Sequence, residues 1–158
     1  MALNKNKRII WLVFAGFIIL SAFLFLLFYN HKSEKLGKGL IEINDKIINI
    51  EIASTRAQWY QGLSDRQSLC PDCGMLFIFP DKQIRKFVMR NMDFPLDIVF
   101  INDKKIINIE KNLNPEGEDP ENIYQSVSDS DMVLELNGKY TDLNDIKTGD
   151  KIILSDNN

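Results

Sequence analysis

The sequence predicts a mostly β protein: a compact sandwich or small barrel of about eight short strands with one or two short helices, preceded by a single N-terminal transmembrane helix. Short apolar runs, several of them with alternating polarity, recur from residue 39 onward and are separated by turn residues, which is typical of β domains. Only one longer stretch there has the start and stop residues of a helix. Residues 9–29 contain no charge at all.

The uncharged segment Ile9–Tyr29 is long enough to cross a bilayer, because about 20 helical residues suffice. A cleaved signal peptide normally has an apolar core of about 7–15 residues followed by small residues. Here the small pair Ser21–Ala22 is followed by FLFLLF. We therefore interpret residues 9–29 as an uncleaved anchor in the lipid bilayer, with a cleaved signal peptide as the alternative. Residues 1–8 form a basic tail, 30–38 a stalk and 39–158 the β domain.

The orientation of the anchor follows from the cations on its two sides. The cations before it are Lys5, Lys7 and Arg8, and those after it are Lys32, Lys35 and Lys38. The positive-inside rule therefore has a narrow margin, but a short basic N-terminus before a first span favours the cytoplasm for that end. We expect a single-pass protein of the cytoplasmic membrane whose C-terminal domain lies outside the cytoplasm. A domain that faces the cytoplasm is the alternative.

The β domain opens with a hairpin, since GLIEI and KIINIEIA flank the turn residues Asn44–Asp45. A capped two-turn helix is expected over residues 54–62, and a further helical turn over 64–67. Strands are then expected at MLFIF, KFVM, LDIVFIN and KIINIEKN, the last two joined by a second hairpin turn. A long irregular loop covers residues 112–130, and loops of that length are often functional or mobile. DMVLELNG and residues 151–154 complete the strands.

Charge and the absence of histidine exclude several classes of function. The net charge is −3, and because residues 1–8 hold three cations and no acid, the rest of the chain carries −6. An acidic domain without a basic stripe is a poor partner for nucleic acid. The single histidine, His31, lies in the stalk, which excludes Ser-His-Asp and Cys-His catalysis in the domain and most zinc and non-haem iron sites. We therefore expect no metal and no cofactor.

The two cysteines, Cys70 and Cys73, form a C-x-x-C pair with three interpretations. A structural disulfide in an oxidising compartment is favoured. A redox dithiol would normally begin a helix, where the dipole lowers the thiol pKa, whereas a strand follows here. A closed zinc site would need four ligands, so only a dimer could complete one.

Asp97 opens a strand whose two faces are both apolar, and a carboxylate in such a place must be paired or hydrogen-bonded. We expect it to pair with Arg66 or Arg90, because an arginine fork matches a carboxylate. Such a pair would hold a loop against the sheet. Alternatively, Arg66, Arg90, Asn91 and Asp97 would line a polar binding pocket at one end of the sheet.

Other side chains have simpler expected roles. Glu135 lies between Leu134 and Leu136, so alternation along the strand predicts that it faces solvent. The aromatic residues Trp59, Tyr60 and Phe87 are expected to belong to the core.

Several motifs of the domain resemble a known family, the bacterial and archaeal domain of unknown function 192. The matching residues are Thr55, Gly62–Leu63, Arg66, Leu69, GMLFIF at 74–79, Phe87, Met89, Asn91, PLDIVFI at 95–101, Leu134–Leu136, Gly138 and Gly149–Asp150. The resemblance covers about residues 40–154. It implies a mostly β domain, often exported or anchored to a membrane, without an agreed activity. The CPDC pair is not part of the family pattern.

Three functions remain open. The first is a non-enzymatic extracytoplasmic module that binds a small molecule or supports an envelope protein. The second is a hydrolase or lyase in which Asp97 is the general acid or base and Arg66 and Asn91 orient the substrate. The third is a thiol-redox protein that uses Cys70 and Cys73.

Overall fold

The computed structural model describes residues 16, 18–21 and 35–156. Of the predicted anchor it describes only Gly16 and the segment 18–21, which are helical, and the rest of the anchor, the basic tail and residues 30–34 lie outside the described residues. Within the described ranges, no helix is long and apolar enough to cross a membrane. The chain divides into two compact units, residues 1–35 and 36–158, and the second unit is the β domain.

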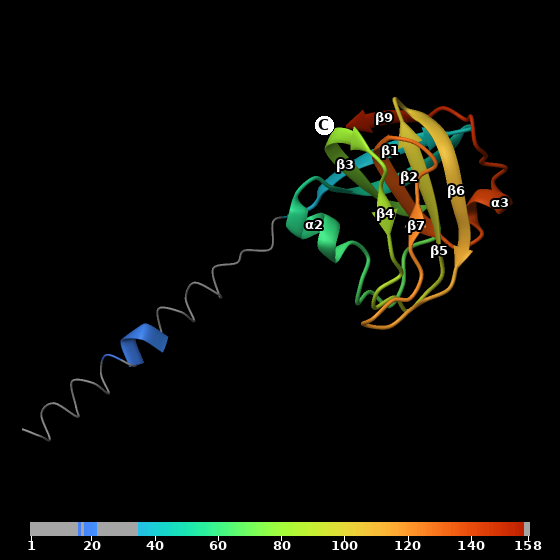
Figure 1. The fold of residues 1–158 in the computed structure, drawn as a ribbon. Helices are drawn as coiled ribbons and strands as arrows, with labels where there is room; N and C mark the ends of the chain where they lie inside the picture. The colour runs from blue at the N-terminus through green and yellow to red at the C-terminus, as the bar shows by residue number, and fades with distance from the viewer. Residues whose placement is uncertain (1–15, 17, 22–34, 157–158) are drawn as a thin grey trace, which may run out of the picture. The chain divides into compact units, whose positions relative to one another are not determined.

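The domain is mostly β, as predicted, and its described residues form nine strands (Figure 1). The elements in chain order are β1 (Gly37–Ile43), β2 (Lys46–Ala53), α2 (Arg56–Gln61), β3 (Cys73–Gln83), β4 (Lys86–Phe87), β5 (Leu96–Asn102), β6 (Lys105–Leu113), β7 (Tyr124–Gln125), β8 (Ser130–Asn137), α3 (Tyr140–Leu143) and β9 (Ile153–Asp156).

Seven strands form one open sheet in the order β6-β5-β8-β3-β2-β1-β9, and β4 pairs with β7 in a separate two-stranded sheet. The end strands β6 and β9 are not paired with each other along their length. A single bridge joins Lys105 to Lys151, and the Ile106 amide donates to the Asp150 carbonyl at 2.9 Å. These bonds tie the first residues of β6 to the segment that leads into β9.

Both predicted hairpins are confirmed, and left-handed residues form their turns. Asn44 and Asp45 have φ of 49° and 62°, and Asp103 and Lys104 have φ of 49° and 61°. Two consecutive left-handed residues characterise the type I′ turn, whose twist matches that of the flanking strands. The turns fix the register, with Ile43 opposite Lys46 and Asn102 opposite Lys105.

Helix α2 is also confirmed, and it links two parallel strands. Thr55 and Gln58 form a capping box at its start, and Gly62 ends it with φ of 49°. The helix lets the chain cross over so that β3 runs parallel to β2, which the sequence pattern alone did not indicate. The predicted helical turn at residues 64–67 is wrong, because the turn that follows α2 ends at residue 65 and the chain is irregular at 66 and 67.

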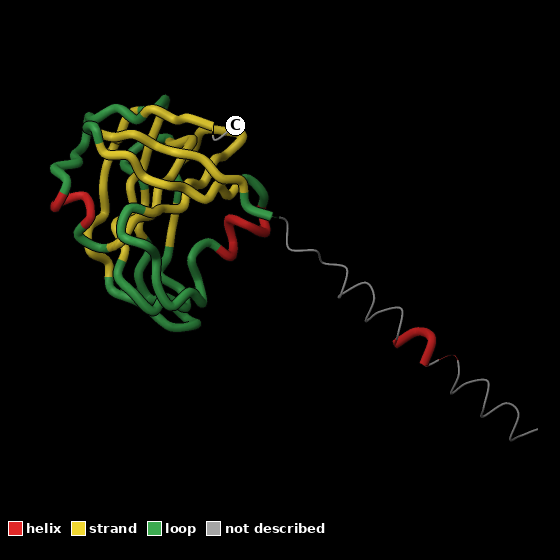
Figure 2. The backbone as a smooth tube through the Cα atoms, turned by 180° about the vertical axis from the view of Figure 1, so that it is seen from behind, coloured by secondary structure: helices red, strands yellow, loops and turns green. Residues whose placement is uncertain are grey.

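The central strands β3, β5 and β8 are covered on both faces. One cluster contains Ile41, Leu76, Val99 and Leu134, and a second contains Met75, Phe77, Ile98 and Val133, which alternate with them along the same strands. Phe87 of β4 and Tyr124 of β7 pack against the second cluster, so the small sheet covers this face. Many of the loops gather at one end of the domain (Figure 2).

Candidate functional site

Asp97 is fully buried, but its partners are not arginines. Its Oδ1 accepts hydrogen bonds from the backbone amides of Asn112 (2.7 Å) and Lys139 (3.0 Å). Its Oδ2 accepts from the Thr141 amide (2.8 Å) and hydroxyl (2.6 Å). The expected ion pair with Arg66 or Arg90 is therefore wrong. Backbone amides satisfy the charge instead, which sequence could not reveal because they come from residues 15 to 44 positions away.

The other three predicted site residues lie elsewhere. Arg66 forms a two-pronged ion pair with Glu51 of β2, at 2.7 and 2.8 Å. Its hydrogen bonds lower the pKa of Glu51, and the carboxylate in turn raises the pKa of Arg66. Arg90 stacks on Tyr60, and the backbone of Asn91 bonds to Asp65 and Gly117. The four residues make no hydrogen bond or ion pair with one another within the described part of the chain, and their role in binding stays a prediction.

Glu135 is the polar residue that sequence reasoning misplaced. Only 5% of it is exposed, and its Oε2 has no hydrogen-bond partner among the described residues. Glu135 does point away from the Leu134 side of the sheet, as alternation predicts, but that face is covered by the second cluster. A glutamate between two leucines is a signal of burial only when the strand is known to be central.

Glu135 contributes to the wall of a cavity of about 460 Å³. Most of the lining is apolar, and much of it is aromatic. The aromatic lining residues are Trp59, Tyr60, Phe77, Phe79 and Phe87, the aliphatic ones are Leu63, Ile84, Val88 and Met92, and the other charged ones are Arg85, Lys86 and Arg90. The cavity thus combines a single carboxyl group with ring faces and a few cations.

Local interactions hold the aromatic wall in place. The capped helix α2 presents Trp59, whose indole N–H donates to the Ala53 carbonyl at 3.0 Å and whose ring lies 4.9 Å from that of Phe79. Phe87 meets Phe77 edge-on, with ring centroids 5.0 Å apart. Such aromatic pairs contribute about 0.5–1.5 kcal/mol beyond their buried area. The ring positions are therefore fixed before any ligand arrives.

Two arginines stack on rings of the cavity wall. The Arg85 guanidinium lies 3.9 Å from the centre of the Phe79 ring and also bonds to Asp81 and to the Ser130 carbonyl. The Arg90 guanidinium lies 3.9 Å from the centre of the Tyr60 ring and donates to the Tyr60 carbonyl. Tyr60 itself is 74% exposed, so the expectation that it belongs to the core is wrong.

Burial raises the pKa of Glu135 to about 8, and the positive charge of Arg66 lowers it only in part. The unpaired, desolvated carboxylate would be costly, so the neutral acid is favoured at pH 7. In that form Glu135 can donate one hydrogen bond and accept others. This is the one buried side chain of the cavity wall with an unused polar atom in the described structure.

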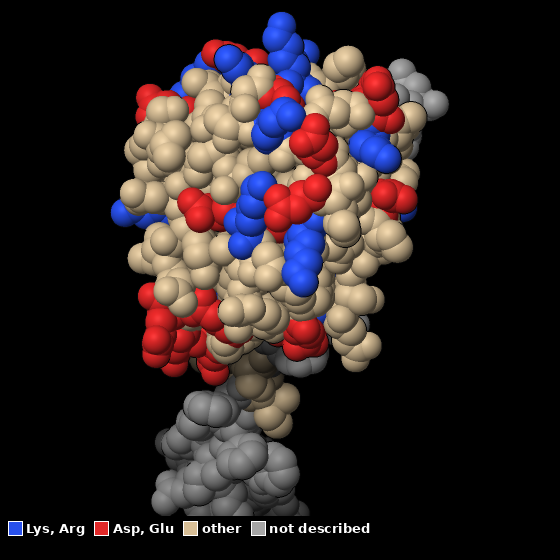
Figure 3. All heavy atoms as spheres, turned by 90° about the vertical axis from the view of Figure 1, so that its right-hand side faces the viewer, with Lys and Arg blue, Asp and Glu red and all other residues tan. Residues whose placement is uncertain are grey.

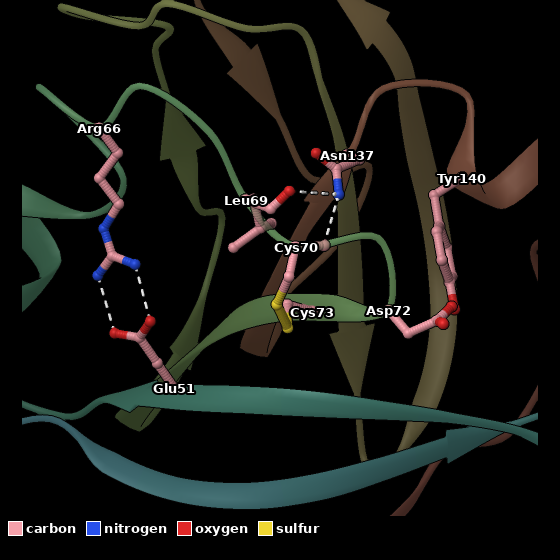
Figure 4. Close-up of a disulfide and its surroundings, with 8 residues drawn as sticks. All are labelled: Glu51, Arg66, Leu69, Cys70, Asp72, Cys73, Asn137 and Tyr140. Carbon is pink, nitrogen blue, oxygen red and sulfur yellow. Dashed lines mark hydrogen bonds and ion pairs between the residues drawn. A yellow bond between two sulfur atoms is a disulfide. The ribbon is translucent and has the colours of Figure 1, made fainter.

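The predicted Cys70–Cys73 disulfide is present (Figure 4). It closes the turn before β3, and Asn137 of β8 donates to the carbonyls of Leu69 (3.4 Å) and Cys70 (2.9 Å). A strand follows Cys73, so no helix dipole acts on its sulfur. The disulfide and the Glu51–Arg66 pair line a second cleft of about 350 Å³, distinct from the Glu135 cavity. These features fit a structural crosslink.

No group of three or more potential metal ligands occurs in the ranges that the structure describes. The Glu135 cavity offers recognition by ring contacts, by one carboxyl group and by cations. Asp97, by contrast, uses both oxygens within the fold and lines none of the cavities given above.

Comparison with known proteins assigns the family. The model of the domain of unknown function 192, described as "Uncharacterized ACR", matches residues 39–154. A crystal structure from Sinorhizobium meliloti 1021, described as "a putative transcription regulator", is 29% identical, with a TM-score of 0.70 over 76% of this chain and 95% of that one. A protein of unknown function from Novosphingobium aromaticivorans DSM 12444 is 30% identical, with a TM-score of 0.67 over 78% and 89% of the two chains. No curated protein matches. The chain belongs to the family of the domain of unknown function 192, as its motifs suggested.

Proposed function

We propose that this protein is a membrane-anchored, extracytoplasmic binding module whose ligand is a small molecule held in the Glu135 cavity. One observation carries the proposal: a buried carboxyl oxygen that has no partner among the described residues belongs to the wall of a cavity of about 460 Å³. Ligand sites are typically clefts of about 300–1,000 Å³ with mostly apolar walls and a few placed polar groups. An unsatisfied buried polar atom costs about 1–3 kcal/mol, which a ligand that bonds to it would offset.

The alternatives have less support. A hydrolase or lyase that uses Asp97 would need an accessible carboxyl group, whereas Asp97 is buried and fully bonded. A redox role for Cys70 and Cys73 has no helix dipole to support it.

The described surface mixes charges of both signs on the face shown in Figure 3. Together with the acidity of the chain beyond residue 8, this disfavours DNA as a partner, although one relative is described as "a putative transcription regulator". An envelope protein remains the alternative partner.

Replacement of Glu135 by methionine is expected to keep or raise stability while it removes ligand binding. Methionine fills a similar volume without a buried polar atom, so the cost of the unpaired oxygen disappears. The measurement is a thermal-shift screen of a small-molecule library against residues 36–158. This unit has its own cores, and the Sinorhizobium relative, 95% of which is matched, was crystallised as little more than this domain.

Compounds that raise the melting temperature of the wild type should fail to raise that of Glu135→Met by a comparable amount. Glu110→Met, on the partly exposed β6 strand of the same sheet, is the matched control and should respond as the wild type does. Hits that stabilise wild type and Glu135→Met equally would refute the proposed site, as would a screen without any hit.

The proposed membrane location rests on the uncharged segment Ile9–Tyr29, which is long enough to cross a bilayer. The proposed extracytoplasmic location rests on the disulfide, because cytosolic thiols are normally kept reduced. The full chain is expected in the membrane fraction with Cys70 and Cys73 oxidised. The measurement blocks free thiols in intact cells, then reduces the protein and labels the released thiols with a maleimide that adds mass. A variant without residues 1–35 is the control and should be cytosolic and reduced. Reduced cysteines in the full chain would contradict the proposed orientation.

A further inference from the structure

The polar groups of the Glu135 cavity restrict what it can hold. Arg85 is neutralised by Asp81, at 2.7 Å, and the hydroxyl of Ser64 donates to the Arg90 carbonyl at 2.8 Å. The indole of Trp59 is also used within the protein. Within the described structure, Glu135 is left as the deep polar contact for a ligand, because it is the buried lining residue whose side-chain oxygen has no partner.

The charge at the cavity is positive. Lys86 and Arg90 form no ion pair with an acid among the described residues, and Glu135 is the sole carboxyl group in the lining. Lys86 is exposed and Arg90 is partly exposed, whereas Glu135 is buried, so the cations lie nearer solvent than the carboxyl group does. Two unpaired cations attract an anion and repel a cation.

The exposed apolar residues of the same wall add a third restriction. Tyr60, Ile84 and Val88 are 74%, 44% and 39% exposed and line the cavity together with the two cations. An organic anion with an apolar ring would cover these side chains while its charge stayed close to Lys86 and Arg90. A small hydrophilic anion such as phosphate would leave the ring faces and Glu135 without contacts.

We propose that the cavity takes a ring-containing organic anion, whose acidic group meets Lys86 and Arg90, whose ring packs on the aromatic wall, and whose hydroxyl or amide meets Glu135. This inference rests on the proposed binding function and narrows its ligand. The ring contacts supply apolar burial, the cations select the sign of the charge, and the Glu135 carboxyl group selects a hydrogen-bonding group at the inner end.

Three fluorescent probes with a common dansyl ring system separate these contributions. Dansylglycine carries a carboxylate, dansylamide is neutral and dansylcadaverine carries an ammonium group at pH 7. In titrations of residues 36–158, dansylglycine is expected to bind about tenfold more tightly than dansylcadaverine, with dansylamide between them. About tenfold corresponds to the contribution of one or two partly exposed charge contacts.

The double variant Lys86→Gln/Arg90→Gln should weaken dansylglycine about tenfold and leave dansylamide within about twofold. Lys104→Gln/Lys105→Gln, which makes the same change in net charge on exposed lysines that do not line the cavity, should leave both affinities unchanged. If the loss of the Arg90 contacts lowers the melting temperature, Lys86→Gln alone keeps the test valid, because Lys86 has no side-chain partner among the described residues.

The outcomes separate this inference from the function on which it rests. If dansylcadaverine binds most tightly and loses affinity in Glu135→Met, the cavity is a binding site but selects cations, and the inference is overturned. If none of the probes binds, or if all bind Glu135→Met as well as the wild type, both the inference and the proposed function fail. Tighter binding of dansylglycine that depends on Lys86 supports both.

Discussion

Asp97→Asn is expected to lower the free energy of unfolding by about 3–5 kcal/mol. Four donors converge on this buried carboxylate, two on each oxygen. An asparagine amide turns one of the two oxygens into a donor, whichever way it is oriented. If the amide nitrogen faces Asn112 and Lys139, two backbone donors lose their acceptor. If it faces Thr141, the Thr141 amide loses its acceptor, while the hydroxyl can turn to accept from the nitrogen. In both orientations the remaining bonds lose the charge that strengthens them.

The reason for this sensitivity is topological. The Asp97 side chain ties the start of β5 to Asn112 near the end of β6 and to Lys139 and Thr141 at the start of α3. Asn112 and Lys139 both have left-handed backbones, with φ of 49° and 70°. Non-glycine residues adopt that conformation at some cost, so a carboxylate that accepts from their amides stabilises it.

Denaturant unfolding of residues 36–158 is the measurement. Asp93→Asn, at an exposed position in the preceding loop, is the matched control and should stay within about 0.5 kcal/mol of the wild type. Thr141→Val removes only the hydroxyl donor and should cost about 1–2 kcal/mol. A loss below about 1 kcal/mol for Asp97→Asn would show that Asp97 is not the architectural anchor that its contacts indicate.

Local signals in the sequence were sufficient for most elements of this fold. Asn44–Asp45 and Asp103–Lys104 form their turns through their own backbone preferences, and the Thr55–Gln58 capping box needs only neighbours. The parallel pairing of β2 with β3 was not predictable, because alternation shows that a segment is a strand but not which strand lies beside it. β7, two residues long, has no pattern of its own and forms only against β4.

The predictions for the candidate site were wrong for the same reason, because they depended on contacts between segments that are far apart in the sequence. Asp97 was correctly marked as a carboxylate that needs partners, but its partners are donors at the end of β6 and at the start of α3, which only the folded chain brings to it. Glu135 was assigned to solvent because its face of β8 was assumed to be open. The β4–β7 pair and the loops cover that face, and they belong to the part of the chain with the weakest local patterns.

Glu135 should make the stability of the domain depend on pH in a way that Glu135→Gln removes. Burial raises its pKa from 4.5 to about 8 in the folded state, whereas the unfolded chain keeps the ordinary value. Below pH 4.5 both states are protonated, so the carboxyl group then contributes no penalty. Between pH 4.5 and 8 the unfolded state ionises while the folded state stays neutral, and stability falls with rising pH by about 1.4 kcal/mol per unit. Above pH 8 both states are ionised and the loss levels off.

The charged groups around Glu135 determine how much of this loss appears. Arg66 lowers its pKa in part, and the cavity places Arg85, Lys86 and Arg90 on the same wall. The difference in unfolding free energy between Glu135→Gln and the wild type is therefore expected to grow by about 3–5 kcal/mol from pH 4.5 to 9. Urea titrations at several pH values measure it, and the difference curve cancels the titration of the other groups.

Glu110→Gln is the control for this pH series. Ile98 of β5 lies between Glu110 and Glu135 in one row across the sheet, but Glu110 is partly exposed. Parallel curves for wild type and Glu135→Gln would mean that Glu135 ionises in the folded protein as it does in water. A difference that grows with pH would instead show that the fold retains a carboxyl group at a cost to its own stability. Such a cost has a physical rationale where the group is needed for a ligand, because an apolar residue at position 135 would stabilise the same strand without it.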